Sequence, residues 1–136
     1  MTLSNTEKMI LNNQITTFRN SLISKKDLNI AVVWSAETYL HNKISDFSPE
    51  EVAAAKETTN DLERLVQESY KKYKKAEKSW NRCYDVVSGG SIIETIWQEA
   101  FDDMTEFFNF SNELGKKCED IRQQMLKNIR DSGVDP

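Results

Sequence analysis

The chain has 136 residues, of which 38% are hydrophobic and 29% charged, and its formal net charge is −4. This length suits a single domain, so residues 1–136 are expected to form one. The acidic balance argues against the basic surface that is typical of nucleic-acid-binding domains. No apolar run approaches the roughly 18 residues of a membrane span, and the aromatic content argues against disorder.

The start of the chain and the two cysteines bear on location. The first residues lack the basic region and the apolar block of a secretory signal peptide. Without such a signal, two cysteines are typical of reduced thiols. The sequence therefore predicts a cytoplasmic protein with no membrane association.

The first third of the chain predicts two short helices. Ser4 and Glu7 have the spacing of a capping box, and apolar residues follow at helical spacing. Asp27 is placed to cap a second helix. The residues expected on the core side are Leu11, Ile15, Phe18 and Leu22 in the first helix, and Ile30, Val33, Trp34, Leu40, Ile44 and Phe47 in the second.

Two longer helices are predicted next, at about 49–87 and 92–130. Ser48-Pro49-Glu50-Glu51 combines an N-cap serine, a proline at the first helical position and a glutamate at the third. Gly89-Gly90 is a natural helix stop, and Ser91 with Glu94 repeats the capping box. Residues 131–136 are expected to form a flexible tail.

Both long segments carry the seven-residue apolar repeat of a coiled coil. If they fold antiparallel about Gly89-Gly90, large residues meet small ones, as in Trp80 with Ala100. One predicted layer, Ser69 with Ser111, is polar. The predicted fold is therefore all-α with four helices: a long antiparallel hairpin, and two shorter N-terminal helices packed near the Gly-Gly turn.

Part of this hairpin lacks a predicted cover. An exposed apolar band is unusual for a soluble monomer, and the two short helices can cover the band near the turn. Helices of about nineteen residues span only about 28 Å. They are too short to cover the far half as well, where Leu62, Leu114 and Ile121 lie. The sequence therefore predicts a homodimer in which a two-fold axis matches the same patch on both chains.

The segment SNTEKMILNNQ (4–14) resembles the opening of the YfbU family of small bacterial helical proteins. The resemblance is carried by Asn5, Ile10-Leu11 and Asn13-Gln14. Ser79-Trp80, at the end of a helix that bears lysines and tyrosines, is also similar to that family. The resemblance implies a helical cytoplasmic protein of bacterial, phage or plasmid origin, and it brings no catalytic residues.

Residues 71–80 read KKYKKAEKSW, a composition that suggests a nucleic-acid contact. Tyr73 and Trp80 belong to the apolar repeat, so they are not free to stack on bases. The outward residues then make one edge of the hairpin basic and the other acidic. A solvated face is the first interpretation, a protein-docking edge the second and nucleic acid the third. The candidate partner-binding residues are Lys71, Lys74, Lys75, Lys78 and Arg82 on the basic edge, and Glu99, Asp102, Asp103 and Glu106 on the acidic edge.

Catalytic and metal-binding signatures are incomplete. His41 is the single histidine, and with Glu37 it supplies two ligands where a catalytic zinc needs three. Cys83 and Cys118 fall in the apolar repeat, where thiols behave as small apolar groups. Glu99-x-x-Asp102 is half of the acidic pattern of all-α nucleotide pyrophosphatases. A metal-dependent hydrolase that uses Glu99, Asp102, Asp103 and Glu106 is therefore the least favoured hypothesis.

The preferred hypothesis is a non-enzymatic helical protein that acts by docking on another protein. It assigns no catalytic, cofactor-binding or metal-binding residues. The alternative is a nucleic-acid-associated regulator that uses the basic edge from Lys71 to Arg82, for which a steep salt dependence is expected.

Overall fold

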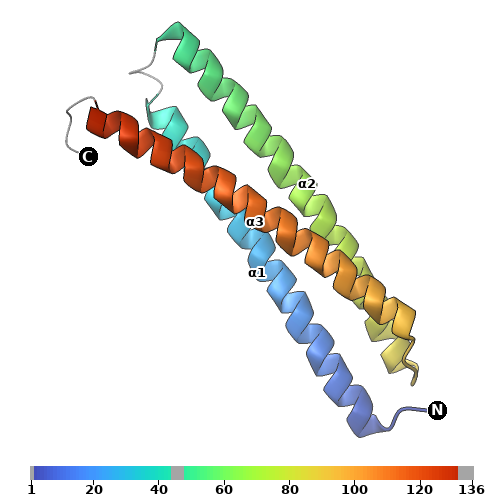
Figure 1. The fold of residues 1–136 in the computed structure, drawn as a ribbon. Helices are drawn as coiled ribbons and strands as arrows, with labels where there is room; N and C mark the ends of the chain where they lie inside the picture. The colour runs from blue at the N-terminus through green and yellow to red at the C-terminus, as the bar shows by residue number, and fades with distance from the viewer. Residues whose placement is uncertain (1, 44–47, 132–136) are drawn as a thin grey trace.

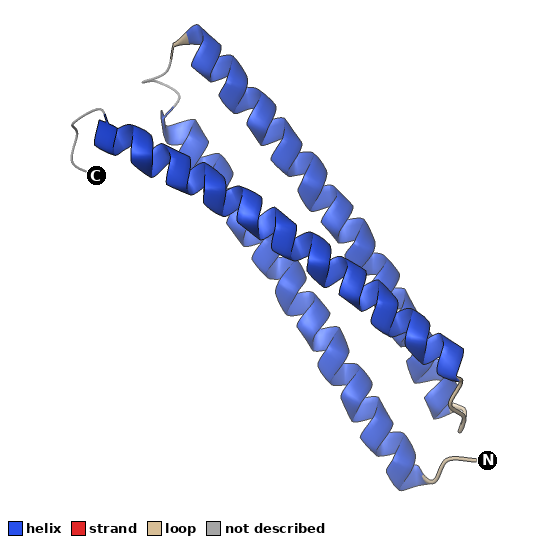
Figure 2. Ribbon diagram, in the orientation of Figure 1, coloured by secondary structure: helices blue, strands red, loops and turns tan. Residues whose placement is uncertain are grey.

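The computed structural model describes residues 2–43 and 48–131. These residues form three long helices, α1 (Asn5–Lys43), α2 (Pro49–Ser88) and α3 (Glu94–Asp131). The described residues are all-α, as expected, but the prediction of four helices is wrong, because the two short N-terminal helices are one continuous helix (Figures 1 and 2). Asp131 belongs to α3, and the rest of the expected tail lies outside the described residues.

The helices form a three-helix bundle in which α1 and α3 run in one direction and α2 runs in the other (Figure 1). The N-terminal segment lies beside the turn between α2 and α3. There the Leu3 amide donates a hydrogen bond of 2.9 Å to the Gly90 carbonyl. Tyr73 of α2 and Phe107 of α3 meet across the hairpin, with ring centroids 6.0 Å apart.

The continuity of α1 is explained by a repeat of buried residues that continues on both sides of Asp27. Ile15, Leu22, Asn29 and Ala36 are spaced by seven residues, and all four are buried. No glycine or proline interrupts this part of the chain, so nothing forces the helix to stop. The repeat is hard to see in the sequence because Asn29 occupies one of its core positions.

The local signals at the helix starts have different outcomes. The capping boxes at Ser4 and Ser48 are confirmed. Each serine hydroxyl accepts a hydrogen bond from the amide three residues later, and the Glu7 and Glu51 carboxylates accept one from the serine amides. The box expected at Ser91 is wrong. The helix begins two residues later than predicted, and the Ile93 carbonyl accepts its first bonds.

The turn after α2 has the geometry of a Schellman motif. Gly90 has a φ of 93°, a left-handed conformation that glycine adopts without steric penalty. The Gly90 amide donates to the Val87 carbonyl and the Ser91 amide donates to the Val86 carbonyl. This arrangement satisfies the last carbonyls of α2 and reverses the chain into α3.

The full length of α1 also covers the hairpin. Val33 and Ala36 pack in one buried cluster with Leu62, Leu114 and Cys118, and Leu40 packs with Ala55 further along. The far half of the hairpin is therefore a three-helix core. The expectation that α1 leaves this half uncovered is wrong. An uncovered hairpin therefore no longer supports the predicted homodimer.

Candidate functional site

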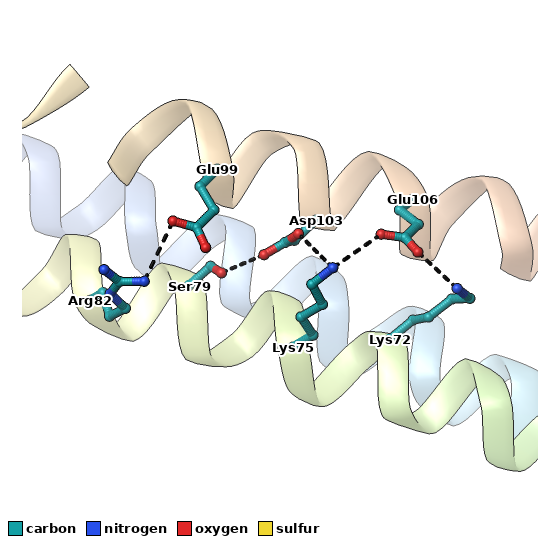
Figure 3. A network of polar contacts seen from close by, with 7 residues as sticks. All are labelled: Lys72, Lys75, Ser79, Arg82, Glu99, Asp103 and Glu106. Carbon is teal, nitrogen blue, oxygen red and sulfur yellow. Dashed lines mark hydrogen bonds and ion pairs between the residues drawn. The ribbon is translucent and has the colours of Figure 1, made fainter. Parts of the chain in front are cut away.

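A ladder of charged side chains joins α2 and α3 (Figure 3). In this charge ladder the Lys72 ammonium lies 2.8 Å from Glu106, and Lys75 lies between Asp103 at 3.4 Å and Glu106 at 3.6 Å. At the end nearer the turn, Arg82 lies 3.4 Å from Glu99. The members of the charge ladder are Lys72, Lys75, Ser79 and Arg82 of α2, and Glu99, Asp103 and Glu106 of α3.

Asp103 is the buried centre of the charge ladder. It is 7% exposed, and the Ser79 hydroxyl donates to its Oδ2 at 2.5 Å while Lys75 neutralises its charge. A buried carboxylate without such partners would carry a large desolvation penalty. The two contacts therefore fix the position of α3 along α2.

The charge ladder joins residues that the sequence assigned to the basic edge and to the acidic edge. Lys75 and Arg82 are exposed as predicted, but they pair with Asp103, Glu106 and Glu99 across the helix interface. The pKa of Glu106 is lowered by its hydrogen bond and charge interaction with Lys72 and by the charge of Lys75. These acidic and basic groups neutralise each other across the interface between α2 and α3.

The remaining candidate residues are exposed and pair within their own helix. Lys71 lies 3.6 Å from Glu68, and Lys74 lies 3.4 Å from Glu77. Asp102 accepts a hydrogen bond of 2.9 Å from Gln98. Lys78 differs, because it has no ion-pair partner among the residues that the structure describes. Sequence reasoning missed Lys72 and Ser79, whose shared spacing of seven residues placed them on the side that faces α3.

The arrangement does not support the metal-dependent hydrolase. Among the described residues, no group of three His, Cys, Asp or Glu side chains is placed to hold a metal ion. The carboxylates of Glu99, Asp103 and Glu106 contact cations or a hydroxyl instead, and Asp102 accepts from the Gln98 amide. Cys83 and Cys118 are free and buried in different core clusters. In the described ranges, no helix has a stretch apolar enough to cross a membrane.

A second feature is an apolar stripe on the side of α1 next to α2. Ile23, Ile30 and Trp34 are exposed there, as is Tyr70 on α2. Trp34 is 66% exposed, the largest fraction among the exposed large apolar side chains of the described residues. The apolar stripe is defined as Ile23, Ile30, Trp34 and Tyr70.

The apolar stripe corrects an assignment made from the sequence. Ile30 and Trp34 were expected on the core side with Val33 and Leu40, but only the latter two are buried. The α1 core side follows Asn29 and Ala36 instead, which turns Ile30 and Trp34 outward. Ile44 and Phe47, expected on the same side, lie outside the described residues.

Two shallow grooves between α1 and α2 adjoin the apolar stripe. One of about 370 Å³ contains Ile30 and Tyr70 with Lys26 and Lys71. The other, of about 500 Å³, begins at Trp34 and is lined also by Glu37, His41 and residues of α2. His41 therefore lines this groove together with Glu37.

Charged residues flank the apolar stripe at both ends. Beyond Trp34, Glu37 lies near Glu63 of α2, and burial and the charge of Glu63 raise its pKa. Its Oε1 atom is buried and accepts no hydrogen bond from the described residues. At the other end, Arg19 donates to Asn81 at 2.9 Å and lies over the Tyr84 ring. The stripe is thus acidic beyond Trp34 and basic before Ile23.

Comparison of the chain with protein-family models, with curated proteins and with solved structures gave no match. The resemblance of residues 4–14 to the YfbU family therefore stays a prediction.

Proposed function

We propose that this chain is a non-enzymatic, cytoplasmic helical binding module that docks on another protein chain through the apolar stripe. The observation that carries the proposal is the exposure of Trp34 beside a groove of about 500 Å³. Tryptophan and tyrosine are enriched among the residues that contribute most to binding at protein interfaces, since their large rings bury much area with little loss of side-chain freedom.

The shape of the face suits an added helix. Ile23, Ile30 and Trp34 follow one another at helical spacing, and the grooves run between α1 and α2. An amphipathic helix recognised in this way inserts its own apolar residues between two helices of its partner. The basic and acidic ends would then orient the bound chain.

The two charged edges offer a weaker docking surface. Five of the nine residues predicted there, Lys75, Arg82, Glu99, Asp103 and Glu106, already pair with each other. Nucleic-acid binding has less support for the same reason, because these cations are neutralised within the chain. Partner binding by the nine residues stays a prediction.

Site-specific photo-crosslinking tests the proposal. A photoreactive amino acid at Trp34 should give a crosslinked protein adduct in the native cell, whereas one at Thr105, exposed on α3, should give much less. A photoreactive amino acid placed at Ile30 should also give the adduct, and adding Trp34→Lys to that variant should abolish it. Equal labelling from Trp34 and Thr105 would show that this face binds no protein selectively.

A further inference from the structure

The identity of the docked chain is constrained by the charges around the apolar stripe. Because α2 runs antiparallel to α1, residues of the two helices share a level: Arg19 with Asn81, Lys26 with Tyr73, and Glu37 with Glu63. By the same register, Lys78 of α2 lies at about the level of Ile23, and its side chain is exposed. Along the two helices, Arg19 and Lys78 lie at the level of one end of the stripe, and Glu37 and Glu63 lie at the level of the other.

The flanking charges are incompletely satisfied within the chain. Glu63 and Lys78 are exposed, and neither has an ion-pair partner in the parts of the chain that the structure describes. Glu37 and Glu63 repel each other, and no cation pairs with either of them among those residues. An external chain that brings positive charge to Glu37 and Glu63 would relieve this repulsion.

A second copy of this chain has the required complement. A two-fold axis across the face, midway between Ile23 and Trp34, exchanges the two ends of the stripe. Ile23 and Trp34 are about 16 Å apart along the helix at 1.5 Å per residue. The acidic end of one copy would then lie over the basic end of the other, and the apolar side chains would meet between them.

We infer that the docked chain is a second copy of this protein, paired antiparallel through the apolar stripe, with Glu37 and Glu63 of each copy facing Arg19 and Lys78 of the other. The inference rests on the proposed function and names its partner. It places the homodimer on the α1–α2 side.

Light scattering and sedimentation over about 1 μM to 1 mM protein test the pairing, since weak interfaces associate in that range. The mass should rise from that of one chain, 15.8 kDa, to twice that value. Trp34→Lys should weaken dimerisation at least tenfold with unchanged helical circular dichroism. A monomer throughout the range, or a dimer that Trp34→Lys leaves intact, overturns the inference.

A charge-reversal mixture tests the antiparallel arrangement. Lys78→Glu and Glu63→Lys should each weaken self-association by roughly tenfold, because like charges then face each other twice per dimer. An equimolar mixture of the two variants should form a heterodimer of full affinity, since each Glu again faces a Lys. Lys117→Glu, which reverses an exposed cation of α3, should have no effect. If the mixture stays as weak as the single variants, the antiparallel pairing is wrong.

The outcome also separates this inference from the proposed function. A purified chain that stays monomeric, together with a Trp34 adduct to a different protein in cells, overturns the self-pairing and keeps the docking face. A monomer without any selective Trp34 adduct overturns both.

Discussion

Asn29 of α1 donates a hydrogen bond of 2.8 Å from its Nδ2 atom to the Ser111 hydroxyl of α3, and both residues are buried. Ser69 of α2 is buried nearby and donates to the Val66 carbonyl. The polar layer expected between α2 and α3 thus also includes Asn29 of α1. A single polar layer in an apolar core ties the helices to one alignment, because any slip leaves a buried group unpaired.

Ser111→Ala is therefore expected to lower the free energy of unfolding by about 1–3 kcal/mol, since it leaves the Asn29 amide without its buried acceptor. Denaturant unfolding followed by circular dichroism measures the change. Asn112→Ala, at the next and exposed position, should stay within about 0.5 kcal/mol. Asn29→Leu combined with Ser111→Ala should recover most of the loss. A double variant no more stable than Ser111→Ala would contradict this account.

The ion pairs and hydrogen bonds of the charge ladder should make very different contributions to the free energy of unfolding. Asp103→Ala is expected to cost about 3 kcal/mol, because it strands the buried Ser79 hydroxyl and leaves Lys75 with one partner. Glu99→Ala removes a pair whose two side chains are half exposed, so its cost should stay below about 1 kcal/mol. Chemical denaturation of the two variants side by side measures the difference. Equal losses would show that the buried position of Asp103 is unimportant.

The continuity of α1 is testable at Asp27. If Asp27 capped a separate helix, Asp27→Ala would destabilise the protein by about 0.5–2 kcal/mol. Inside a continuous helix, the same change should be neutral or stabilise by up to about 0.7 kcal/mol, since alanine has the higher helix propensity. Ser48→Ala removes a true cap and should cost about 1 kcal/mol. Similar losses from both substitutions would restore the two-helix interpretation.

Cys83 should resist alkylation in the folded protein. Burial raises the pKa of its thiol to about 11, so only about a thousandth of it is thiolate at pH 8. Iodoacetamide labelling read by mass spectrometry should be at least about 100-fold slower than in denaturant, where the thiol pKa returns to about 8.5. Rapid labelling of Cys83 in the native protein would contradict its place in the core.

Glu37→Gln should stabilise the dilute protein at neutral pH by about 0.5 kcal/mol, the scale of exposed charge pairs. Burial and the charge of Glu63 raise the pKa of Glu37, so its ionised form is disfavoured in the folded state. As the pH falls through that raised pKa, Glu37 takes up a proton and the advantage of the amide should disappear. Glu57→Gln removes an equal charge from an exposed position on α2 and serves as the control. An advantage that persists in acid would exclude the electrostatic explanation.

The sequence alone determined the features that depend on neighbouring residues. The capping boxes at Ser4 and Ser48 and the stop at Gly89-Gly90 are set by local hydrogen bonds and by the backbone freedom of glycine. The seven-residue repeats of the second and third helices also identified buried residues such as Trp80 and Ala100, because each repeat is regular and largely apolar.

Only the tertiary structure decided how far α1 runs and which way it faces. Asp27 has the chemistry of a cap, but packing of Leu22, Asn29 and Ala36 on the other helices overrides that local preference. Trp34 is apolar and belongs by pattern to a core, yet the side of α1 that faces inward is fixed by partners such as Ser111, far away in the chain. Helical periodicity defines a face, whereas contacts between distant segments decide what that face meets.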